Sequence, residues 1–156
     1  MDLSDILQPG AVEAALRAAT KKQLLAALAQ RASGLTGFAA KDILATLTER
    51  ERLGSTGFGS GTAIPHGKLP GLGEVTGVFA RLATPVAYDA IDGQPVDLVF
   101  LLLAPEGAGA DNLKALARVS RAFRDRALTA KLRGSTSPDA LYAMLAGDRD
   151  APRRAA

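Results

Sequence analysis

The fold is decided by Val96-Asp97-Leu98-Val99-Phe100-Leu101-Leu102-Leu103, which is apolar at every position except Asp97. A continuous apolar run of this length is typical of a β-strand that other elements cover on both faces. We therefore expect this strand to form the centre of a β-sheet.

Periodicity and turn residues predict further elements on each side of this strand. The expected strands are residues 62–64, 75–82 and 86–88, and the expected helices are about 20–32, 39–53, 111–123, 128–132 and a last helix from 138. Ser33-Gly34 is expected to end the first helix, Pro85 to end a strand, and residues 68–73 to form a turn-rich connector. Asp111 is expected to cap its helix, with Leu113 on the apolar face.

This order of elements predicts an α/β fold, in which a mixed β-sheet is flanked by helices on both faces as an α/β/α sandwich. The chain has 156 residues and is 47% hydrophobic, which suits one well-buried core. We expect a single domain over residues 1–147 and a disordered tail over 148–156.

Composition excludes several function classes. The chain has no cysteine and one histidine, so we expect no disulfide, no metal site and no cofactor. Basic residues alternate with acids and aromatic residues make up only 4%, which argues against nucleic-acid binding. The sequence contains no run of twenty apolar residues and no signal-peptide pattern, so we expect a cytoplasmic protein without direct membrane insertion.

A glycine-rich loop, Gly54-Ser55-Thr56-Gly57-Phe58-Gly59-Ser60-Gly61, leads to the only histidine, His66. Glycines permit positive φ angles and bring backbone N–H groups close to a bound anion. The loop lacks a Walker pattern because Leu69 follows Gly67-Lys68, and it lacks a dinucleotide fingerprint because a helix precedes it. It also lacks the Gly-x-Ser-x-Gly spacing of a serine hydrolase.

His66 is the candidate reactive group. A lone histidine is more often structural, but a phosphorylated imidazole needs donors, which the loop backbone, Ser55, Thr56 and Arg50 could supply. We expect one ring nitrogen to be unprotonated and the other to donate its N–H to a carbonyl or carboxylate. Arg50 fits equally well as a charge at a helix end, and the loop alone could bind a small anion.

Other residues near His66 have more ordinary interpretations. Phe58, Ile64 and Leu69 could form an apolar collar for a docking protein, although Phe58 fits a core position equally well. The neighbouring acids, which are Glu49, Glu51 and Glu74, are expected to be solvated surface residues because acids are rarely buried.

Two segments resemble a known family. Arg50-Glu51-Arg52-Leu53-Gly54-Ser55-Thr56-Gly57-Phe58-Gly59, continuing to Ala63-Ile64-Pro65-His66-Gly67-Lys68, resembles the active-site segment of mannitol- and fructose-type enzyme IIA domains of the bacterial phosphotransferase system. Thr84-Pro85-Val86-Ala87-Tyr88-Asp89-Ala90-Ile91-Asp92-Gly93-Gln94-Pro95-Val96-Asp97-Leu98 is similar to the nitrogen-regulatory branch. The resemblance spans most of the chain.

This resemblance implies a phosphotransferase with a phosphohistidine intermediate and a mixed sheet flanked by helices. His66 would accept a phosphoryl group through Nε2 from a histidine-containing phosphocarrier protein, and Arg50 would stabilise its charge. Ser55, Thr56 and Gly57 would bind the phosphate. Members of the nitrogen branch regulate target proteins such as potassium-transport components or sensor kinases.

The chain departs from the family pattern after the long strand. Sugar-type members and some nitrogen-branch members carry a further histidine there, where this chain has Asp111-Asn112-Leu113-Lys114. Asn112 could donate a hydrogen bond to the phosphate, and Lys114 could supply a positive charge. The departure favours regulation. A sugar-specific enzyme IIA component and a regulatory binding protein that is never phosphorylated remain the alternatives.

Overall fold

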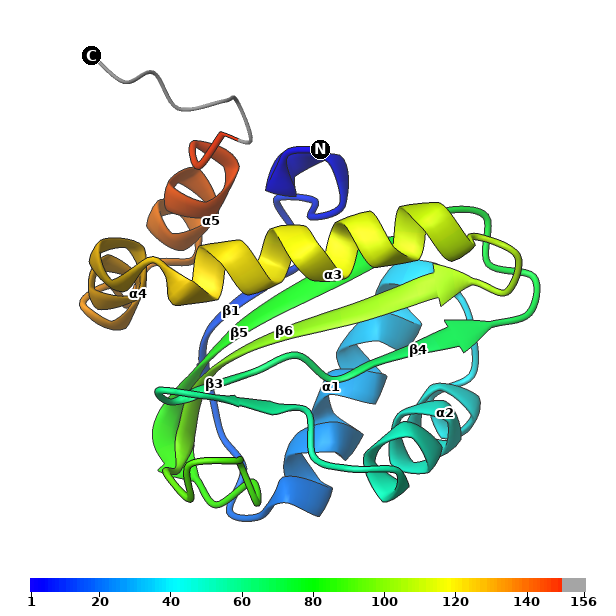
Figure 1. Ribbon diagram of the computed structural model, residues 1–156, viewed down its shortest axis with the longest axis horizontal. Coiled ribbons are helices and arrows are strands. Elements are labelled where there is room, and N and C mark those ends of the chain that lie inside the picture. Colours follow the sequence, from blue (N-terminus) through cyan, green and yellow to red (C-terminus); the bar gives the residue numbers. More distant parts are fainter. Residues whose placement is uncertain (150–156) are drawn as a thin grey trace.

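The central strand is β6 (Val96–Pro105), and a mixed β-sheet is built around it in the computed structural model, which describes residues 1–149 (Figure 1). The other strands are β1 (Val12–Leu16), β2 (Gly57–Gly59), β3 (Thr62–Ala63), β4 (His66–Leu69) and β5 (Thr76–Val86). The helices are α1 (Lys21–Thr36), α2 (Ala40–Arg52), α3 (Gly109–Arg124), α4 (Arg126–Arg133), α5 (Pro138–Ala146) and a short 3-10 helix, η1 (Leu3–Asp5).

β6 lies inside the sheet. It pairs antiparallel with β5 on one side and parallel with β3 and β4 on the other, in the order β1-β5-β6-β3-β2 with β4 also beside β6. Seven successive residues, Leu98–Ala104, are almost completely buried. The predictions of a central strand at 96–103 and of a mixed sheet are both confirmed.

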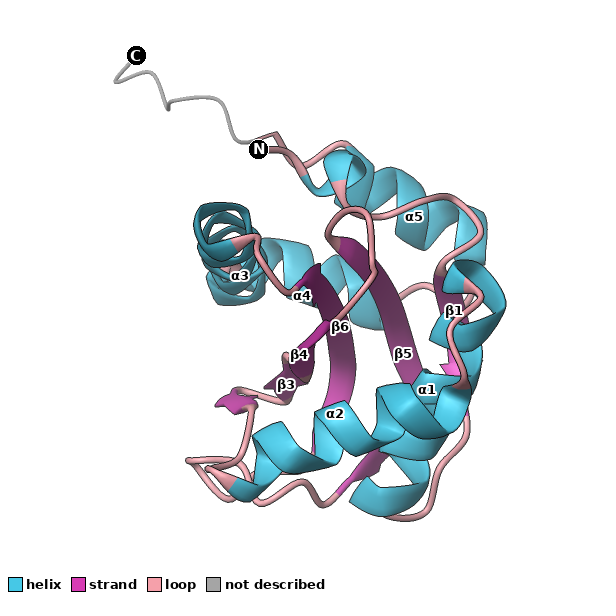
Figure 2. Cartoon of the chain, turned by 90° about the vertical axis from the view of Figure 1, so that its right-hand side faces the viewer, coloured by secondary structure: helices cyan, strands magenta, loops and turns pink. Residues whose placement is uncertain are grey.

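Helices cover both faces of this sheet, as Figure 2 shows. Alternating residues of β6 enter two separate cores: Phe100 packs with α3, α4 and α5, whereas Leu101 packs with α1 and α2. Alternation along a strand sends neighbouring side chains to opposite faces, so a strand buried on both faces is apolar throughout. The predicted α/β/α sandwich is therefore confirmed.

Two predicted breaks do not occur. α1 continues through Ser33-Gly34 and ends at Gly37, whose φ of 79° places it in the left-handed conformation of a helix cap. A single helical glycine costs only about 1 kcal/mol, which the burial of Leu28 and Ala32 can offset. β5 likewise continues through Pro85. Pairing with β6 is irregular between Arg81 and Val86, so proline interrupts no regular ladder there.

The start of α3 was also predicted wrongly. Ala108 is the N-cap, while Asp111 lies within the first turn, and Leu113 is 67% exposed instead of facing the core. The buried face of the helix is formed by Ala115, Val119, Ala122 and Phe123. Residues 68 and 69, expected in a connector, belong to β4, and the short strands β1 and β2 were not predicted.

A disordered tail was predicted for residues 148–156. All but its first two residues lie outside the described residues, which end at Arg149. Asp148 accepts hydrogen bonds from Arg118, and Arg149 lies 3.4 Å from Asp2. None of the helices in residues 1–149 combines the length and the hydrophobicity that a membrane-spanning helix requires.

Candidate functional site

His66 is the first residue of β4 and is fixed by the register of the sheet. Thr62 lies opposite Leu98 in the β3–β6 pair, and His66 lies opposite Leu102 in the β4–β6 pair, so the segment keeps one register along β6. Pro65 stands between the two strands and accepts a hydrogen bond from the N–H of Leu102. The position of His66 is therefore set by the central strand.

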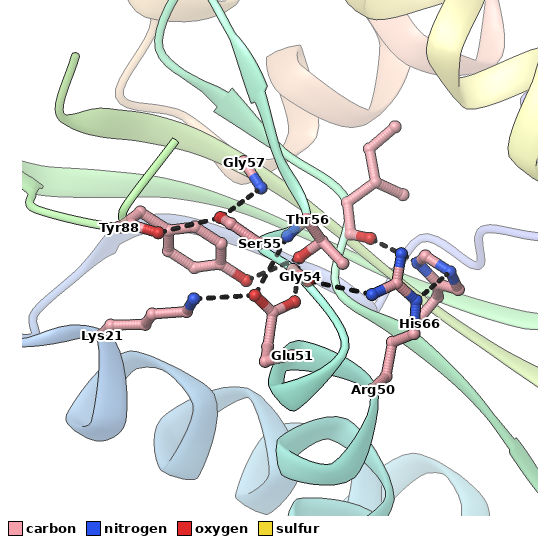
Figure 3. Close-up of polar contacts among 10 residues, drawn as sticks. Lys21, Arg50, Glu51, Gly54, Ser55, Thr56, Gly57, His66 and Tyr88 are labelled. Atoms are coloured by element: carbon pink, nitrogen blue, oxygen red, sulfur yellow. Dashed lines mark hydrogen bonds and ion pairs between the residues drawn. The ribbon is translucent and has the colours of Figure 1, made fainter. Parts of the chain in front are cut away.

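Two contacts fix the tautomer of the His66 ring (Figure 3). Its Nδ1 lies 2.7 Å from the carbonyl oxygen of Ile64, which can only accept, so Nδ1 carries the proton. Its Nε2 lies 3.3 Å from Nε of Arg50, which can only donate, so Nε2 presents a lone pair. The expectation that a carbonyl or carboxylate orients the ring is confirmed, and Ile64 supplies the carbonyl.

The surroundings of His66 favour its neutral form. Burial lowers the pKa of the imidazole below its usual value of 6.5, and the nearby positive charge of Arg50 lowers it further. The hydrogen bond to Ile64 and the charge of Glu51 act in the opposite direction, but the net shift is downward. At neutral pH the ring is therefore uncharged, and its Nε2 carries no proton.

Arg50 joins the end of α2 to the loop and to His66. Its Nη1 donates to the carbonyl of Gly54 at 2.9 Å while Nε contacts the imidazole. Of the two interpretations of Arg50, the structure favours a residue that reaches the histidine over an isolated charge at a helix end.

The three loop residues predicted to bind phosphate lie beside Arg50, and their polar groups bond within the protein. Ser55 Oγ donates to the carbonyl of Tyr88 and accepts from the N–H of Gly57, both at 3.0 Å. The N–H of Thr56 donates to Glu51 at 3.0 Å, and its hydroxyl contacts both Glu51 and the Tyr88 hydroxyl. Phosphate binding by these residues stays a prediction.

Glu51 was predicted to be a solvated surface residue, and this prediction is wrong. Its side chain is only 7% exposed, and its Oε1 lies 2.8 Å from Lys21 Nζ, which in turn lies 4.4 Å from the centre of the Tyr88 ring. Figure 3 shows this cluster beside Arg50. Burial of the Tyr88 hydroxyl raises its pKa above the usual value. One signal was present in the sequence: Glu51 continues, at a spacing of four, the buried stripe of Ile43 and Leu47. Glu49 was correctly expected to be exposed.

Two adjoining pockets bring the predicted site residues together. One, of about 350 Å³, is lined by Arg50, Ser55, Thr56, Gly57 and His66. The other, of about 680 Å³, shares Arg50 and His66 and adds Lys68 and Asn112. We refer to the two as the His66 pockets. Lys114 lines neither of them.

Of the three residues predicted to form an apolar collar, only Phe58 is exposed. Leu69 packs in the core against α1 and α2, and Ile64 is buried although it lines the smaller pocket. Phe58 is partly exposed, and two residues not predicted for the collar, Leu53 and Ile91, are 82% and 87% exposed beside the pockets. Hence the exposed apolar side chains come from the end of α2, from β2 and from the segment between β5 and β6.

Residues 1–149 contain no cluster of three or more acidic, histidine or cysteine side chains arranged to hold a metal ion. The site offers a neutral imidazole beside a guanidinium, which is an arrangement suited to an anionic electrophile such as a phosphoryl group.

Residues 5–147 match the family model described as "Phosphoenolpyruvate-dependent sugar phosphotransferase system, EIIA 2". The chain belongs to this family. This EIIA 2 chain is 52% identical over 146 residues to a nitrogen regulatory protein of Bradyrhizobium diazoefficiens. The aligned residues cover 94% of this chain and 95% of that protein. The chain is 42% identical to a nitrogen regulatory protein of Pseudomonas aeruginosa, over 90% of the chain and 92% of that protein.

Solved structures agree with the EIIA 2 assignment. The nitrogen regulatory protein IIA-Ntr of Neisseria meningitidis superimposes with a TM-score of 0.86 at 34% identity, covering 92% of this chain and 98% of that one. The mannitol IIA of Escherichia coli shares the fold, with a TM-score of 0.74 at 19% identity over 89% of this chain and 98% of that one. The chain is thus an EIIA-type protein similar to nitrogen regulatory proteins.

Proposed function

We propose that this chain is a histidine phosphocarrier, in which His66 accepts a phosphoryl group from a histidine-containing phosphocarrier protein and thereby controls the binding of target proteins. One observation carries the proposal: the contact of Nδ1 with Ile64 leaves the lone pair of Nε2 directed toward Arg50 and the His66 pockets.

The proposed step is an in-line transfer between two imidazoles. The Nε2 lone pair of His66 forms a bond to phosphorus while the P–N bond of the carrier's phosphohistidine breaks and returns its electron pair to that ring. The His66 ring gains positive character and keeps its Nδ1 proton, which the Ile64 carbonyl stabilises. No other covalent chemistry is required of the protein, because positioning and charge stabilisation carry such transfers.

Arg50 is the proposed source of charge stabilisation, because its guanidinium already lies beside the attacking nitrogen. In the phosphorylated protein, Ser55, Thr56 and Gly57 would exchange some internal hydrogen bonds for bonds to phosphate oxygens. Asn112 would supply a side-chain amide from the other side, in the larger pocket.

The proposed docking surface for the carrier consists of Leu53, Phe58 and Ile91, the exposed apolar residues around the His66 pockets. A regulatory role is supported by the relatives, which are named nitrogen regulatory proteins. The proposed targets are proteins such as potassium-transport components or sensor kinases, and the proposed compartment is the cytoplasm.

Phosphorylation can be tested directly by incubating the chain with phosphoenolpyruvate, enzyme I and the phosphocarrier protein. We expect one acid-labile phosphate on the wild type and none on His66→Gln, a variant that keeps a polar side chain of similar size. A label that persists in His66→Gln, or no label on the wild type, would overturn the proposal.

Arg50→Ala is expected to slow labelling while the far-UV circular dichroism stays unchanged.

Regulation requires a separate measurement. Pull-downs with phosphorylated wild type, unphosphorylated wild type and His66→Gln should recover a target whose binding follows the phosphorylation state. Recovery of the same proteins at the same level in all three would contradict a phosphorylation-dependent regulator and favour a binding protein that needs no phosphate.

A further inference from the structure

A third pocket, of about 580 Å³, shares Phe58 with the smaller of the two His66 pockets. Three of the residues that line it are arginines: Arg124 at the end of α3, and Arg126 and Arg133 at the two ends of α4. We call it the arginine pocket. Ser60, in the turn between β2 and β3, also lines it.

Most of this positive charge is uncompensated. Arg133 pairs with Asp97, whose oxygens lie 2.9 and 3.0 Å from its Nε. Among residues 1–149, no carboxylate pairs with Arg124 or Arg126, and both side chains are exposed. The nearest acid in sequence, Asp125, is committed to capping α4 through the N–H groups of its first turn. Three guanidinium groups therefore share one pocket with a single paired carboxylate.

We propose that the arginine pocket binds a phosphate-bearing small molecule that carries at least a diphosphate group. Guanidinium forks match phosphate oxygens in pairs, and Arg124 and Arg126 approach from neighbouring helix ends. The pocket is larger than one phosphate group needs, which favours a diphosphate over a single phosphate. Its concave, polar lining favours a small anion over a flat protein surface.

Occupancy of this site is communicated to the His66 pockets through the β2–β3 turn. Ser60 has a φ of 54°, a left-handed conformation that is uncommon for a residue other than glycine. Its carbonyl accepts from Nη2 of Arg133 at 2.7 Å, and its N–H donates to Asp92 at 2.9 Å. A ligand that attracts Arg133 would loosen the first of these bonds and shift the turn next to Phe58.

Binding can be measured by isothermal titration calorimetry with pyrophosphate as the probe and inorganic phosphate as the smaller anion. We expect saturable binding of pyrophosphate and weaker binding of phosphate. The double variant Arg124→Gln/Arg126→Gln should lose affinity by about tenfold or more, since two charge-assisted contacts are removed. The matched control is Arg17→Gln/Lys22→Gln, which removes two exposed positive charges outside the arginine pocket and should bind as the wild type does.

Nuclear magnetic resonance supplies the second readout. Pyrophosphate should shift the amide signals of Phe58 and Ser60 together with the ring signal of His66.

The proposal is overturned by an absence of saturable binding in the millimolar range, or by equal weakening in the control variant, which would indicate attraction to net charge alone. An acidic peptide that binds this pocket more tightly than pyrophosphate would overturn it in favour of a protein partner. Neither experiment requires His66 to be phosphorylated.

Discussion

At His66, burial and Arg50 act together on one imidazole. Burial penalises the charged ring, and the guanidinium repels a proton from Nε2. The Ile64 carbonyl opposes both effects by stabilising the Nδ1 proton, so it fixes the tautomer without restoring the usual pKa. The residue is therefore neutral over a wider pH range than a solvated histidine.

The pH dependence of His66 follows from this shift. The chain has one histidine, so its ring protons give a single titration curve, whose midpoint we expect below 6.5. Arg50→Ala should raise that midpoint, because it removes a nearby positive charge and exposes the ring. A midpoint in Arg50→Ala at or below the wild-type value would contradict the contact.

The same shift links stability to pH. Between the lowered pKa and 6.5, the unfolded chain binds more protons than the folded chain, so the free energy of unfolding falls as pH falls through that window. Urea unfolding at several pH values should show this loss in the wild type and a smaller one in His66→Gln. Parallel curves for the two proteins would exclude a contribution from His66.

Glu51 offers a second prediction at the scale of the residue. Glu51→Gln removes the charge that pairs with Lys21 and weakens the bonds to Thr56, so we expect a loss of about 2–4 kcal/mol in the free energy of unfolding. The matched control is Glu49→Gln on the same helix, where the side chain is 67% exposed and the expected loss is below about 0.5 kcal/mol. Similar losses in both variants would argue against the buried cluster.

The proximity of Arg50 to His66 was predictable, because both belong to the segment that resembles the family and because α2 ends just before the glycine-rich loop. The burial of Glu51 was not predicted, because its partners Lys21 and Tyr88 come from distant segments. Local patterns predicted which residues lie together at the candidate site, whereas the spacing of Glu51 from Leu47 was only a weak sign of burial without knowledge of its distant partners.

At the scale of the elements, α1 shows how packing overrides a local signal. Gly34 lies inside the helix with no neighbouring atom within 4 Å of an added Cβ, while Gly37 has a φ of 79° at the helix end. The sequence predicted a stop one turn too early because both glycines look alike in sequence. Only the second has a backbone conformation that a side chain disfavours.

These two glycines predict opposite effects of the same substitution. Gly34→Ala should stabilise the protein by about 0.5–1 kcal/mol, because alanine loses less backbone entropy in a helix. Gly37→Ala should destabilise it by about 1 kcal/mol, because the Cβ disfavours positive φ. Thermal and urea unfolding of the two variants would measure the difference, and an equal sign for both would contradict the position of the helix end.

The contact between α2 and β4 supports a further prediction. A Cβ on Gly67 would lie 2.3 Å from the Cγ2 methyl of Thr46, one helical turn before Arg50. Gly67→Ala should therefore cost about 1–3 kcal/mol and disturb the His66 titration. Thr46→Ser removes that methyl and should recover much of the loss in the double variant. If the double variant instead lost the sum of the two single losses in the free energy of unfolding, Gly67 and Thr46 would not be in contact.

For the whole molecule, the sequence predicted the layers better than the connections within the sheet. β6 was recognisable because it is long and apolar at nearly every position, and α4 and α5 because Gly134 and Ser137 mark their limits. β1, β2 and β4 are too short for a clear alternating pattern. β1 pairs with β5, β4 with β6 and β2 with β3, so their places in the sheet depend on other strands.

The exposed apolar rim of the His66 pockets leads to a prediction about docking of the proposed phosphocarrier protein. Ile91→Ser should raise the KM for the phosphocarrier about three- to tenfold with little change in kcat or stability, because an 87% exposed side chain adds apolar contact only in the complex. Leu35→Ser, on α1 and outside these pockets, is the control and should leave KM unchanged. Equal effects on KM would remove Ile91 from the docking surface.

The register between β4 and β6 also governs when the site can appear during folding. His66 and Leu102 are far apart in sequence but are paired in parallel strands, and parallel long-range pairing forms slowly because a long loop must close first. During synthesis, the imidazole has no fixed place until β6 has left the ribosome. In a refolding experiment, the native signal of His66 should accordingly arrive with the slowest structural phase, after helical circular dichroism is complete.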